Sequence, residues 1–554
     1  MAPTTPTTRI EKEKNTSLGK NVLMLMGGLF AAKLMGLIYR IVIINIDGFG
    51  DVGNGYYSVG YTIYSVLLTL SSIGVPAVIS KLVSERIASG DYKGSQRVLR
   101  VSFGLFLSVS VVSAAFLYFG SDWIAASILK VPDAALTMKA LAPAVIFACA
   151  IAVLRGYFSG MGSMKATSSS QVVEQFFNCV LSILFVWLCI GQGPAKMAAA
   201  GNLSTSASIL AALIYLIFFY WRRSREIRTS CRTQTAPADD RTTKAMVGMI
   251  LALSIPMTAS SLISALNEFI DTFTVTNCIQ TAYSGILTAK ADLEAKAAEA
   301  AGLLSKVNTI INLPLALNTA FSTALVPAVS AAVAKKDAVL AGKKLSFSML
   351  ASLTIMFPCG VGLAVLSDPI LHLLYPNASS GALLLALSVI PMMFLALTCI
   401  VNSGLYGIGE ARLPALALGI AAVLKLLLNL LLISRPAIQV YGAVISSIVC
   451  DAVVFLIVYL ALRRRMPLTL HFWPHVLKPA FCAAVMGVAV WGTHTLLKGV
   501  AGNAVATAAA VIVGVVVYGL LVVIVRVLTA EEVQSLPLGD KLFRLLRKLG
   551  FYRA

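Results

Sequence analysis

The chain is organised around its first apolar stretch, residues 21–45, which reads NVLMLMGGLFAAKLMGLIYRIVIIN. This run is long enough to cross a bilayer as a helix, yet it contains Lys33 and Arg40. A charge at mid-membrane costs roughly 2.5 to 3.5 kcal/mol on insertion scales, so such residues usually face a wet cavity or a partner. The two cations are seven residues apart and share one helix face. That face suits an anion such as a phosphate; snorkelling toward the headgroups is the alternative for either side chain.

The composition indicates a polytopic membrane protein. Of the 554 residues, 58% are hydrophobic and only 12% are charged, and the mean hydropathy is +0.86. The first apolar run is too long for a cleavable signal, and no small-residue cleavage site follows it. Apolar segments of about 20 residues recur as spanning helices require. We expect fourteen spans, at residues 21–45, 57–80, 100–120, 137–160, 172–190, 201–221, 247–276, 304–330, 346–367, 382–406, 413–433, 440–462, 476–496 and 504–527.

The net charge of +20 follows membrane topology and does not indicate nucleic-acid binding. Lys and Arg gather in alternate loops, which by the positive-inside rule predicts that both termini are cytoplasmic. Residues 1–20 are expected to be a polar, disordered tail, and residues 528–554 a basic amphipathic helix on the inner surface. The longest basic loop, residues 222–246, is interpreted as an orientation signal attracted to anionic lipid. Its arginines include Arg222, Arg223, Arg225, Arg228 and Arg232.

The basic linker 222–246 divides the chain into two similar halves. The run VPAV closes the second span at residues 75–78 and the eighth at 326–329, and other pairs recur in the same order. Such spacing predicts a parallel repeat, with an N-lobe at 21–221, a C-lobe at 247–462 and a site between the lobes. The two spans within 463–527 then lie outside the repeat.

Two predicted spans carry polar residues where lipid would be expected. The seventh contains Glu268 and Asp271, and the eighth contains Lys306, Asn308 and Asn312. Such groups need partners in apolar surroundings, so we expect a lined cavity between spans 1, 2, 7 and 8. The alternative for the asparagines, and also for Glu268 and Asp271, is that they only form hydrogen bonds between helices. An acid here could bind a coupling cation or balance the charge of a cavity arginine.

A further acid, Glu174, lies in the fifth span, at the position that Lys425 occupies in the eleventh. We interpret Glu174 as a packing or salt-link residue, with charge balancing in the cavity as its functional alternative. Arg155, at the inner end of the fourth span, is interpreted as a helix-terminal charge that contacts headgroups.

The sequence shows no catalytic set. Its four histidines have no ligand spacing to acids or cysteines, and its nine cysteines form no CxxC pair, so neither a metal site nor a disulfide framework is indicated. There is no phosphate-binding Walker loop either, which argues against an ATP-driven pump. We therefore expect a transporter that is not an enzyme and that is powered by an ion gradient or the membrane potential.

Linked motifs give the chain a family resemblance. They are DVGNGYYSVGY (51–61), GVPAVISK (74–81), GDYK (90–93), LRGYFSG (154–160) and SQVVEQ (170–175). Together they resemble the Gram-positive branch of the lipid II flippase family, which includes the stage V sporulation protein B group. The resemblance covers nearly the whole chain.

The resemblance implies an all-α multidrug/oligosaccharidyl-lipid/polysaccharide exporter fold of fourteen helices. Two six-helix lobes would form a V that opens alternately to either side, and two further helices would form a lipid-facing groove. The implied cargo is undecaprenyl-pyrophosphate carrying the disaccharide-pentapeptide, moved from the inner to the outer leaflet of a bacterial cytoplasmic membrane. No cofactor is implied beyond a coupling cation or the membrane potential. The implied partners are the lipid-linked glycan, membrane lipids and cell-wall synthesis proteins.

In that family, cavity cations from helices 1, 2 and 8 are thought to hold the pyrophosphate. Lys33 and Arg40 match the helix 1 pair, although one family branch spaces this pair by six residues. Lys81 matches the helix 2 cation only if that helix runs past its predicted end, and Lys306 is a looser match on helix 8. Residues 288–303, rich in Ala, Lys and Glu, are expected to form a loop longer than the family pattern.

Three other functions are compatible with parts of this pattern. An exporter of another polyprenyl-linked polysaccharide would need a similar pyrophosphate site. A drug/cation antiporter of the same fold would favour acidic cavity residues, whereas the first span here is cationic. A membrane scaffold for wall synthesis would tolerate neutralisation of Lys33 and Arg40, and a transporter would not.

Overall fold

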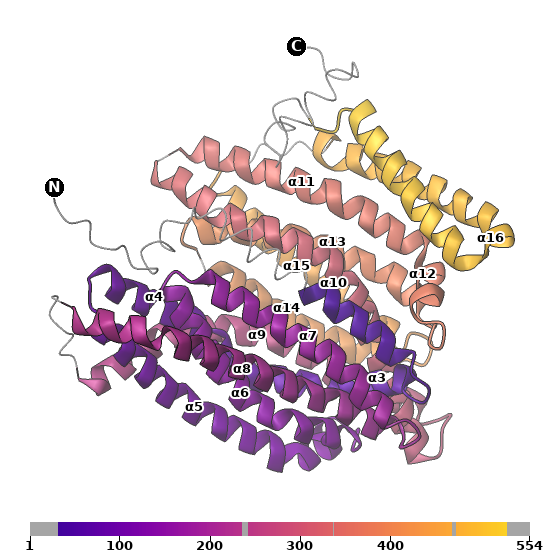
Figure 1. The fold of residues 1–554 in the computed structure, drawn as a ribbon. Helices are drawn as coiled ribbons and strands as arrows, with labels where there is room; N and C mark the ends of the chain where they lie inside the picture. Colours follow the sequence, from indigo (N-terminus) through magenta and orange to yellow (C-terminus); the bar gives the residue numbers. More distant parts are fainter. Residues whose placement is uncertain (1–31, 235–241, 336, 411, 468–472, 529–554) are drawn as a thin grey trace. The chain divides into compact units, whose positions relative to one another are not determined.

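Helices make up all the regular structure that the computed structural model describes, which covers residues 32–234, 242–335, 337–410, 412–467 and 473–528 (Figure 1). Twelve helical runs there are long and apolar enough to cross a membrane. The last of them, Trp473–Ile524, joins two helices that meet at Gly502, where φ is 75°. The predicted all-α polytopic fold is confirmed. Of the first predicted span, a helix at residues 32–44 is described; the tails 1–20 and 529–554 lie outside the described residues.

The chain divides into two compact units. The first comprises Met1–Lys306 and Asn429–Val440, and the second comprises Val307–Leu428 and Tyr441–Ala554. Helix α10 (Lys290–Ala334) and helix α14 (Arg412–Ile433) therefore each contribute to both units. The other long helices of the first unit are α3 (Gly50–Leu68), α4 (Val75–Ala88), α5 (Tyr92–Trp123), α6 (Ala134–Gly160), α7 (Met164–Leu188), α8 (Pro194–Arg232) and α9 (Thr243–Tyr283).

Helix α6 is the centre of the first unit. It is buried along most of its length, and α3, α4, α5 and α8 pack against it (Figure 1). Small residues allow the closest approach: a Cβ added to Gly156 would lie 2.8 Å from the carbonyl oxygen of Pro76, and one added to Gly160 would lie 2.7 Å from that of Ser80. Glycine at these two positions therefore sets the distance between α4 and α6.

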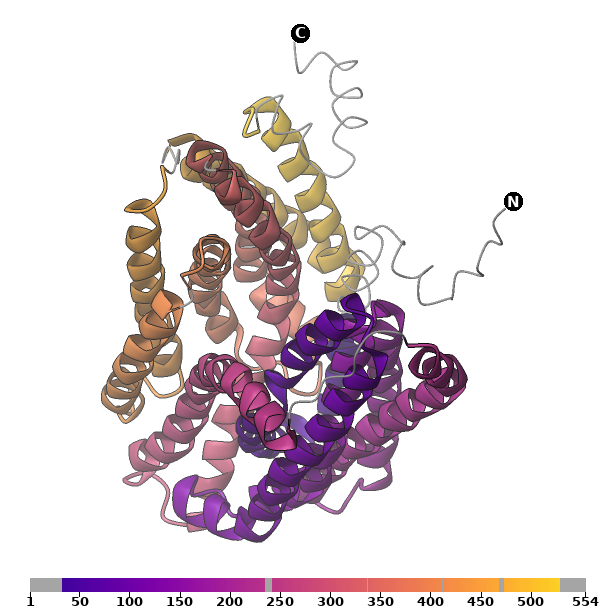
Figure 2. The same cartoon turned by 90° about the vertical axis from the view of Figure 1, so that its left-hand side faces the viewer.

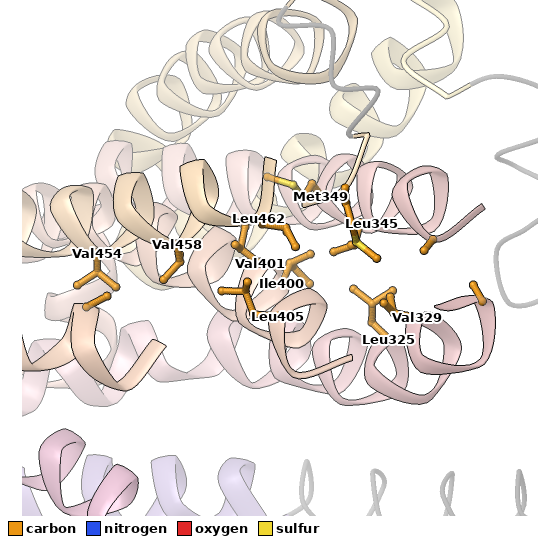
Figure 3. Close-up of a cluster of buried hydrophobic side chains, with 14 of the residues drawn as sticks. Leu325, Val329, Leu345, Met349, Ile400, Val401, Leu405, Val454, Val458 and Leu462 are labelled. Atoms are coloured by element: carbon orange, nitrogen blue, oxygen red, sulfur yellow. The ribbon is translucent and has the colours of Figure 1, made fainter. Parts of the chain in front are cut away.

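The second unit has its core among α11 (Ala338–Val365), α13 (Ala382–Gly407) and α15 (Tyr441–Arg463), with α10 and α14 packed alongside (Figure 3). Leucine, valine and isoleucine side chains from these helices interdigitate there. A Cβ added to Gly407 would lie 2.7 Å from Val329 Cγ1, the counterpart in this unit of the contact between Gly160 and α4. The two halves of the sequence thus use glycine in the same way.

The last two helices form the two arms of α16 (Lys478–Ile524), on either side of Gly502. The arms pack against each other, since a Cβ added to Gly514 would lie 2.8 Å from Val490 Cγ2 (Figures 1 and 2). The Tyr518 hydroxyl donates a hydrogen bond to the carbonyl oxygen of Thr354 at 2.8 Å, which ties this pair to α11.

Three predicted boundaries were wrong. Residues 288–303 were expected to form a loop, but α10 begins at Lys290, because this alanine-rich segment has high helix propensity and buries Ala297, Ala298, Ala300 and Ala301. The basic segment from Arg222 was also expected to be a loop, whereas α8 continues through Arg232. The second span continues past residue 80, since α4 runs to Ala88.

Candidate functional site

Arg40 is held in place by three side chains of the first unit. Its Nη1 donates to the Oδ1 of Asn54, and lies 3.5 Å from the Oγ of Ser305. Its Cζ lies 4.3 Å from the ring centroid of Tyr57, a cation–π geometry. Arg40 itself is only partly buried. Because a guanidinium stays protonated in proteins, this arrangement presents a fixed positive charge on the helix at residues 32–44.

Asn54 connects the Arg40 contact to the backbone of α10. It is fully buried, and its Nδ2 donates to the carbonyl oxygen of Gly302 at 2.7 Å. The helices α3 and α10 come unusually close here: a Cβ added to Gly55 would lie 1.8 Å from the carbonyl oxygen of Ala298. One added to Gly302 would lie 1.9 Å from that of Asp51. Only glycine fits at either position, so this crossing is fixed by backbone contact.

Lys306, predicted to face the substrate, is fully buried in this conformation. Its Nζ lies 2.7 Å from the Oδ1 of Asp51, and the two side chains are 0% and 9% exposed. Lys306 thus forms an ion pair one turn along α10 from Gly302. A role for Lys306 in binding substrate stays a prediction, and in this conformation its charge is compensated by Asp51.

The predicted acids lie in different surroundings. Glu174 accepts a hydrogen bond from Arg155 at 2.7 Å, so the predicted salt link is present. Asn429 donates to the Oδ1 of Asp271 at 3.1 Å and to the Oγ1 of Thr274 at 2.9 Å. Glu268 is exposed on α9.

Tyr61 lies beside the aromatic partner of Arg40. Its ring is 40% exposed and stacks on that of Tyr57, with ring centroids 6.4 Å apart. An exposed aromatic side chain of α3 therefore adjoins the ring on which Arg40 packs.

The remaining predicted residues do not join this cluster by any described contact. Lys33 is exposed on the first helix, and Lys81 is exposed on α4, which does extend far enough to include it. Asn308 and Asn312 are exposed on the part of α10 that belongs to the second unit. Their roles in binding stay predictions.

Metal-ligating side chains do not gather within the described part of the chain. Across the described residues, no three His, Cys, Asp or Glu side chains lie close enough to hold a metal ion. All nine cysteines are free.

Sequence reasoning missed Asp51, Asn54, Ser305 and Tyr57. Asp51 and Asn54 lie within the quoted motif DVGNGYY, but they precede the predicted second span and were not considered as partners of the cations. Asp51 and Asn54 are three residues apart among glycines, and this spacing could have indicated two polar side chains on one face of a closely packed helix. The partner of Asp51 is 255 residues away, and no local pattern indicates such a pair.

Comparison of the chain with known proteins gives a family match. A family model described as "Polysaccharide biosynthesis protein" matches residues 18–333, more than half of the chain. Three relatives come from Bacillus subtilis (strain 168). An uncharacterized membrane protein, YabM, is 28% identical over 96% of this chain and 96% of its own length. Stage V sporulation protein B is 25% identical over 94% and 98%. The lipid II flippase MurJ is 23% identical over 78% and 80%.

Solved structures show the same fold. A lipid II flippase MurJ in an inward closed conformation matches with a TM-score of 0.66 at 14% identity, covering 90% of this chain and 98% of that one. An inward-facing multidrug resistance MATE family transporter of the MOP superfamily matches with a TM-score of 0.61 at 12% identity, covering 80% and 98%. The predicted MOP-type fold is thus confirmed.

Proposed function

Since the chain belongs to the polysaccharide biosynthesis protein family, we propose that it is a flippase for a polyprenyl-pyrophosphate-linked glycan. The specific cargo that we propose is lipid II, moved from the inner to the outer leaflet of the bacterial cytoplasmic membrane for cell-wall synthesis. Similarity to a lipid II flippase over 78% of the chain supports this choice.

The observation that carries the proposal is the fixed position of Arg40. Asn54 and Tyr57 orient its guanidinium, while the side chain keeps partial exposure. A guanidinium is suited to phosphate because its planar fork can donate two parallel hydrogen bonds. We assign Arg40 to the pyrophosphate, with Lys33 seven residues earlier as a second contact along the same helix face.

The pyrophosphate is the group that cannot cross lipid unaided. Transfer of its charge into hydrocarbon without partners is prohibitive, whereas the isoprenoid tail is soluble in the bilayer throughout. Alternating access that moves only the headgroup past fixed cations therefore suffices. The exposed Asn308 and Asn312 can supply hydrogen-bond donors to the sugar or phosphate oxygens.

The acids of the first unit are assigned to charge balance and coupling. Glu268 and Asp271 lie one helical turn apart on α9, and the Asp271 carboxylate is oriented by Asn429. A carboxylate held by an amide offers oxygen ligands to a hard monovalent cation, and its charge would offset that of the arginine as the cargo leaves. Glu174 remains a structural partner of Arg155.

The orientation that we propose follows from the basic segments. Arginines cluster at the end of α8 and at residues 463–465, and by the positive-inside rule this supports a cytoplasmic position for these helix ends and for both termini.

Lipid II leaflet distribution tests the proposal in cells that depend on this protein. We expect the native chain to externalise lipid II, and Arg40→Ala to leave it on the inner leaflet at equal protein levels. Lys139→Ala is the matched control, because Lys139 pairs with a 70% exposed Asp122 at the surface of the first unit. Normal externalisation by Arg40→Ala would refute the assignment of Arg40.

The cargo itself is tested by the native chain. The same cation site would accept any polyprenyl-pyrophosphate glycan, so the assay should include a second glycan on the same lipid carrier. If lipid II stays inside while the other glycan is externalised, the flippase activity stands and the cargo is different.

A further inference from the structure

Helix α8 continues beyond the part of it that is suited to lipid. Its exposed side chains from Leu203 to Trp221 are apolar, and Trp221 is 69% exposed. About three further turns follow to Arg232. Along these turns the exposed side chains are mainly arginines, so the surface of the helix changes from apolar to basic within one turn of Trp221.

The length of the apolar part matches a bilayer. At 1.5 Å per residue, the 18 residue steps from Leu203 to Trp221 extend about 27 Å, close to the roughly 30 Å thickness of a hydrocarbon core. Tryptophan is enriched at the boundary between hydrocarbon and headgroups. Trp221 therefore marks the level at which a headgroup layer begins, and this layer is the cytoplasmic one in the orientation proposed above.

The basic surface faces the same side as the apolar one. At about 100° per residue, the exposed apolar residues and three arginines fall within an arc of about 100°. The apolar members are Leu203, Leu210, Ile214, Ile217, Phe218 and Trp221. We call Arg225, Arg228 and Arg232 the arginine stripe; all three are exposed. The stripe thus continues the lipid-facing side of α8 into the headgroup layer.

The charge of the stripe is not compensated by the acid beside it. Glu226 lies on another side of the helix, where it is 3.8 Å from Arg223, and Arg223 is nearly buried and packs on Phe219. Within the part of the chain that the structure describes, no carboxylate pairs with a member of the stripe. The stripe therefore presents three positive charges toward the membrane surface.

We infer that the arginine stripe is a binding site for anionic phospholipid headgroups of the cytoplasmic leaflet. The occupant is a phospholipid because the stripe joins an apolar, lipid-covered surface without interruption, and it is anionic because three guanidinium groups face it. This role is separate from the choice of cargo, and it concerns the lipid that surrounds the protein.

The three arginines contribute unequally because of their depth. Arg225 is about 6 Å beyond Trp221 along the helix, Arg228 about 10 Å and Arg232 about 16 Å. A headgroup layer is about 5 to 8 Å thick, and a long arginine side chain can reach back toward it. Arg225 and Arg228 therefore contact headgroups. Arg232, about 16 Å beyond Trp221, is farther from that level than the Debye length of about 8 to 10 Å, so its attraction to the headgroups is weak.

Tryptophan fluorescence can measure the lipid beside the stripe. The chain has five tryptophans, so the full-length protein would keep Trp221 and carry Phe at the other four positions. It would be placed in nanodiscs of phosphatidylcholine with a minority of phosphatidylglycerol, and either lipid would be brominated to quench nearby tryptophan. Nanodiscs offer one lipid mixture to both leaflets, so the result does not depend on the direction in which the chain was inserted.

We expect brominated phosphatidylglycerol to quench Trp221 well beyond its share of the lipid. Each surface arginine favours anionic lipid about five-fold, so Arg225→Gln and Arg228→Gln should each reduce the enrichment by about that factor, and Arg232→Gln by less than two-fold. Arg225→Lys should keep most of it. All four variants lie at exposed positions, and an unchanged thermal midpoint shows that each of them is folded.

Trp187 gives the matched control. It is 59% exposed at the end of α7, and the five residues that follow it carry no Lys or Arg. A variant that keeps only Trp187 should show no preference between the two lipids. Equal quenching of Trp221 by both lipids, or an enrichment that survives the loss of both Arg225 and Arg228, would overturn the inference.

Discussion

Replacing Lys306 by Met should strongly destabilise the conformation described here. The Nζ of Lys306 lies 2.7 Å from the Oδ1 of Asp51, with the side chains 0% and 9% exposed. Removing the ammonium leaves a carboxylate buried without its ion-pair partner, and such a change costs about 3 to 5 kcal/mol. At about 2 °C per kcal/mol, the thermal midpoint should fall by about 6 to 10 °C.

The double variant Asp51→Asn/Lys306→Met separates the charge from the packing. With both charges removed, no buried ion is left uncompensated, and neutral replacements of buried pairs are often as stable as the originals. We therefore expect the double variant to regain most of the lost stability. The assay is thermal unfolding of the full-length protein in one detergent, followed by near-ultraviolet circular dichroism.

Two results would refute this reasoning. One is a midpoint for Lys306→Met within about 2 °C of the native value, which would mean that Lys306 is not paired in a buried environment. The other is a double variant no more stable than the single one. A reversed pair, Asp51→Lys/Lys306→Asp, then decides whether Lys306 also binds cargo: recovery of both stability and flipping would leave it a purely structural partner.

Two further predictions concern the first unit. Gly302→Ala should lower the thermal midpoint, because the added Cβ would lie 1.9 Å from the carbonyl oxygen of Asp51. The matched control is Gly362→Ala in α11, which should be neutral or slightly stabilising because nothing lies within 4 Å of the added Cβ. Equal effects of the two changes on the midpoint would contradict this account of the α3–α10 crossing. Glu174→Gln should destabilise by about 1 to 3 kcal/mol, since it leaves the partly buried Arg155 without its ion pair, yet flipping should persist at equal protein levels; loss of flipping in a folded variant would instead give Glu174 a role in transport.

Much of the fold could be predicted from the sequence because lipid imposes a length on apolar segments. The predicted span 382–406 differs by no more than one residue at either end from α13, Ala382–Gly407. The hydropathy pattern did not predict helices beyond the ends of the apolar segments. Too many polar side chains for a spanning pattern occur in residues 290–303 and 222–232. The first segment is helical because it is rich in alanine, and the second because it continues α8.

The site was less predictable than the fold because its partners are distant in the sequence. Hydropathy identified Arg40 and Lys306 as charges in apolar surroundings, and both are indeed held by polar partners on α3. It could not indicate that Asp51 would pair with Lys306, since contact between α3 and α10 depends on the approach of glycines. Hydropathy also could not tell that Lys306 would be buried in an ion pair while Arg40 keeps partial exposure.

The two cation contacts converge on one turn of α3, and this makes a last prediction. Asp51 holds Lys306, and Asn54, three residues later, holds Arg40 and the backbone of Gly302. Asn54→Ala removes both of its hydrogen bonds at a fully buried position, one of them to a charged group, a loss of about 2 to 4 kcal/mol. Arg40 then loses its orientation while it keeps its charge.

Flipping should therefore fall about ten-fold or more in Asn54→Ala, approaching the loss in Arg40→Ala. Ser305→Ala should have little effect, because its 3.5 Å contact with Arg40 is at the limit of a hydrogen bond. The measurement is the rate of lipid II externalisation at matched protein levels. If Asn54→Ala flips normally, or if Ser305→Ala is equally damaging, the charge of Arg40 matters without its alignment by α3, and the cation site must be assembled by other contacts.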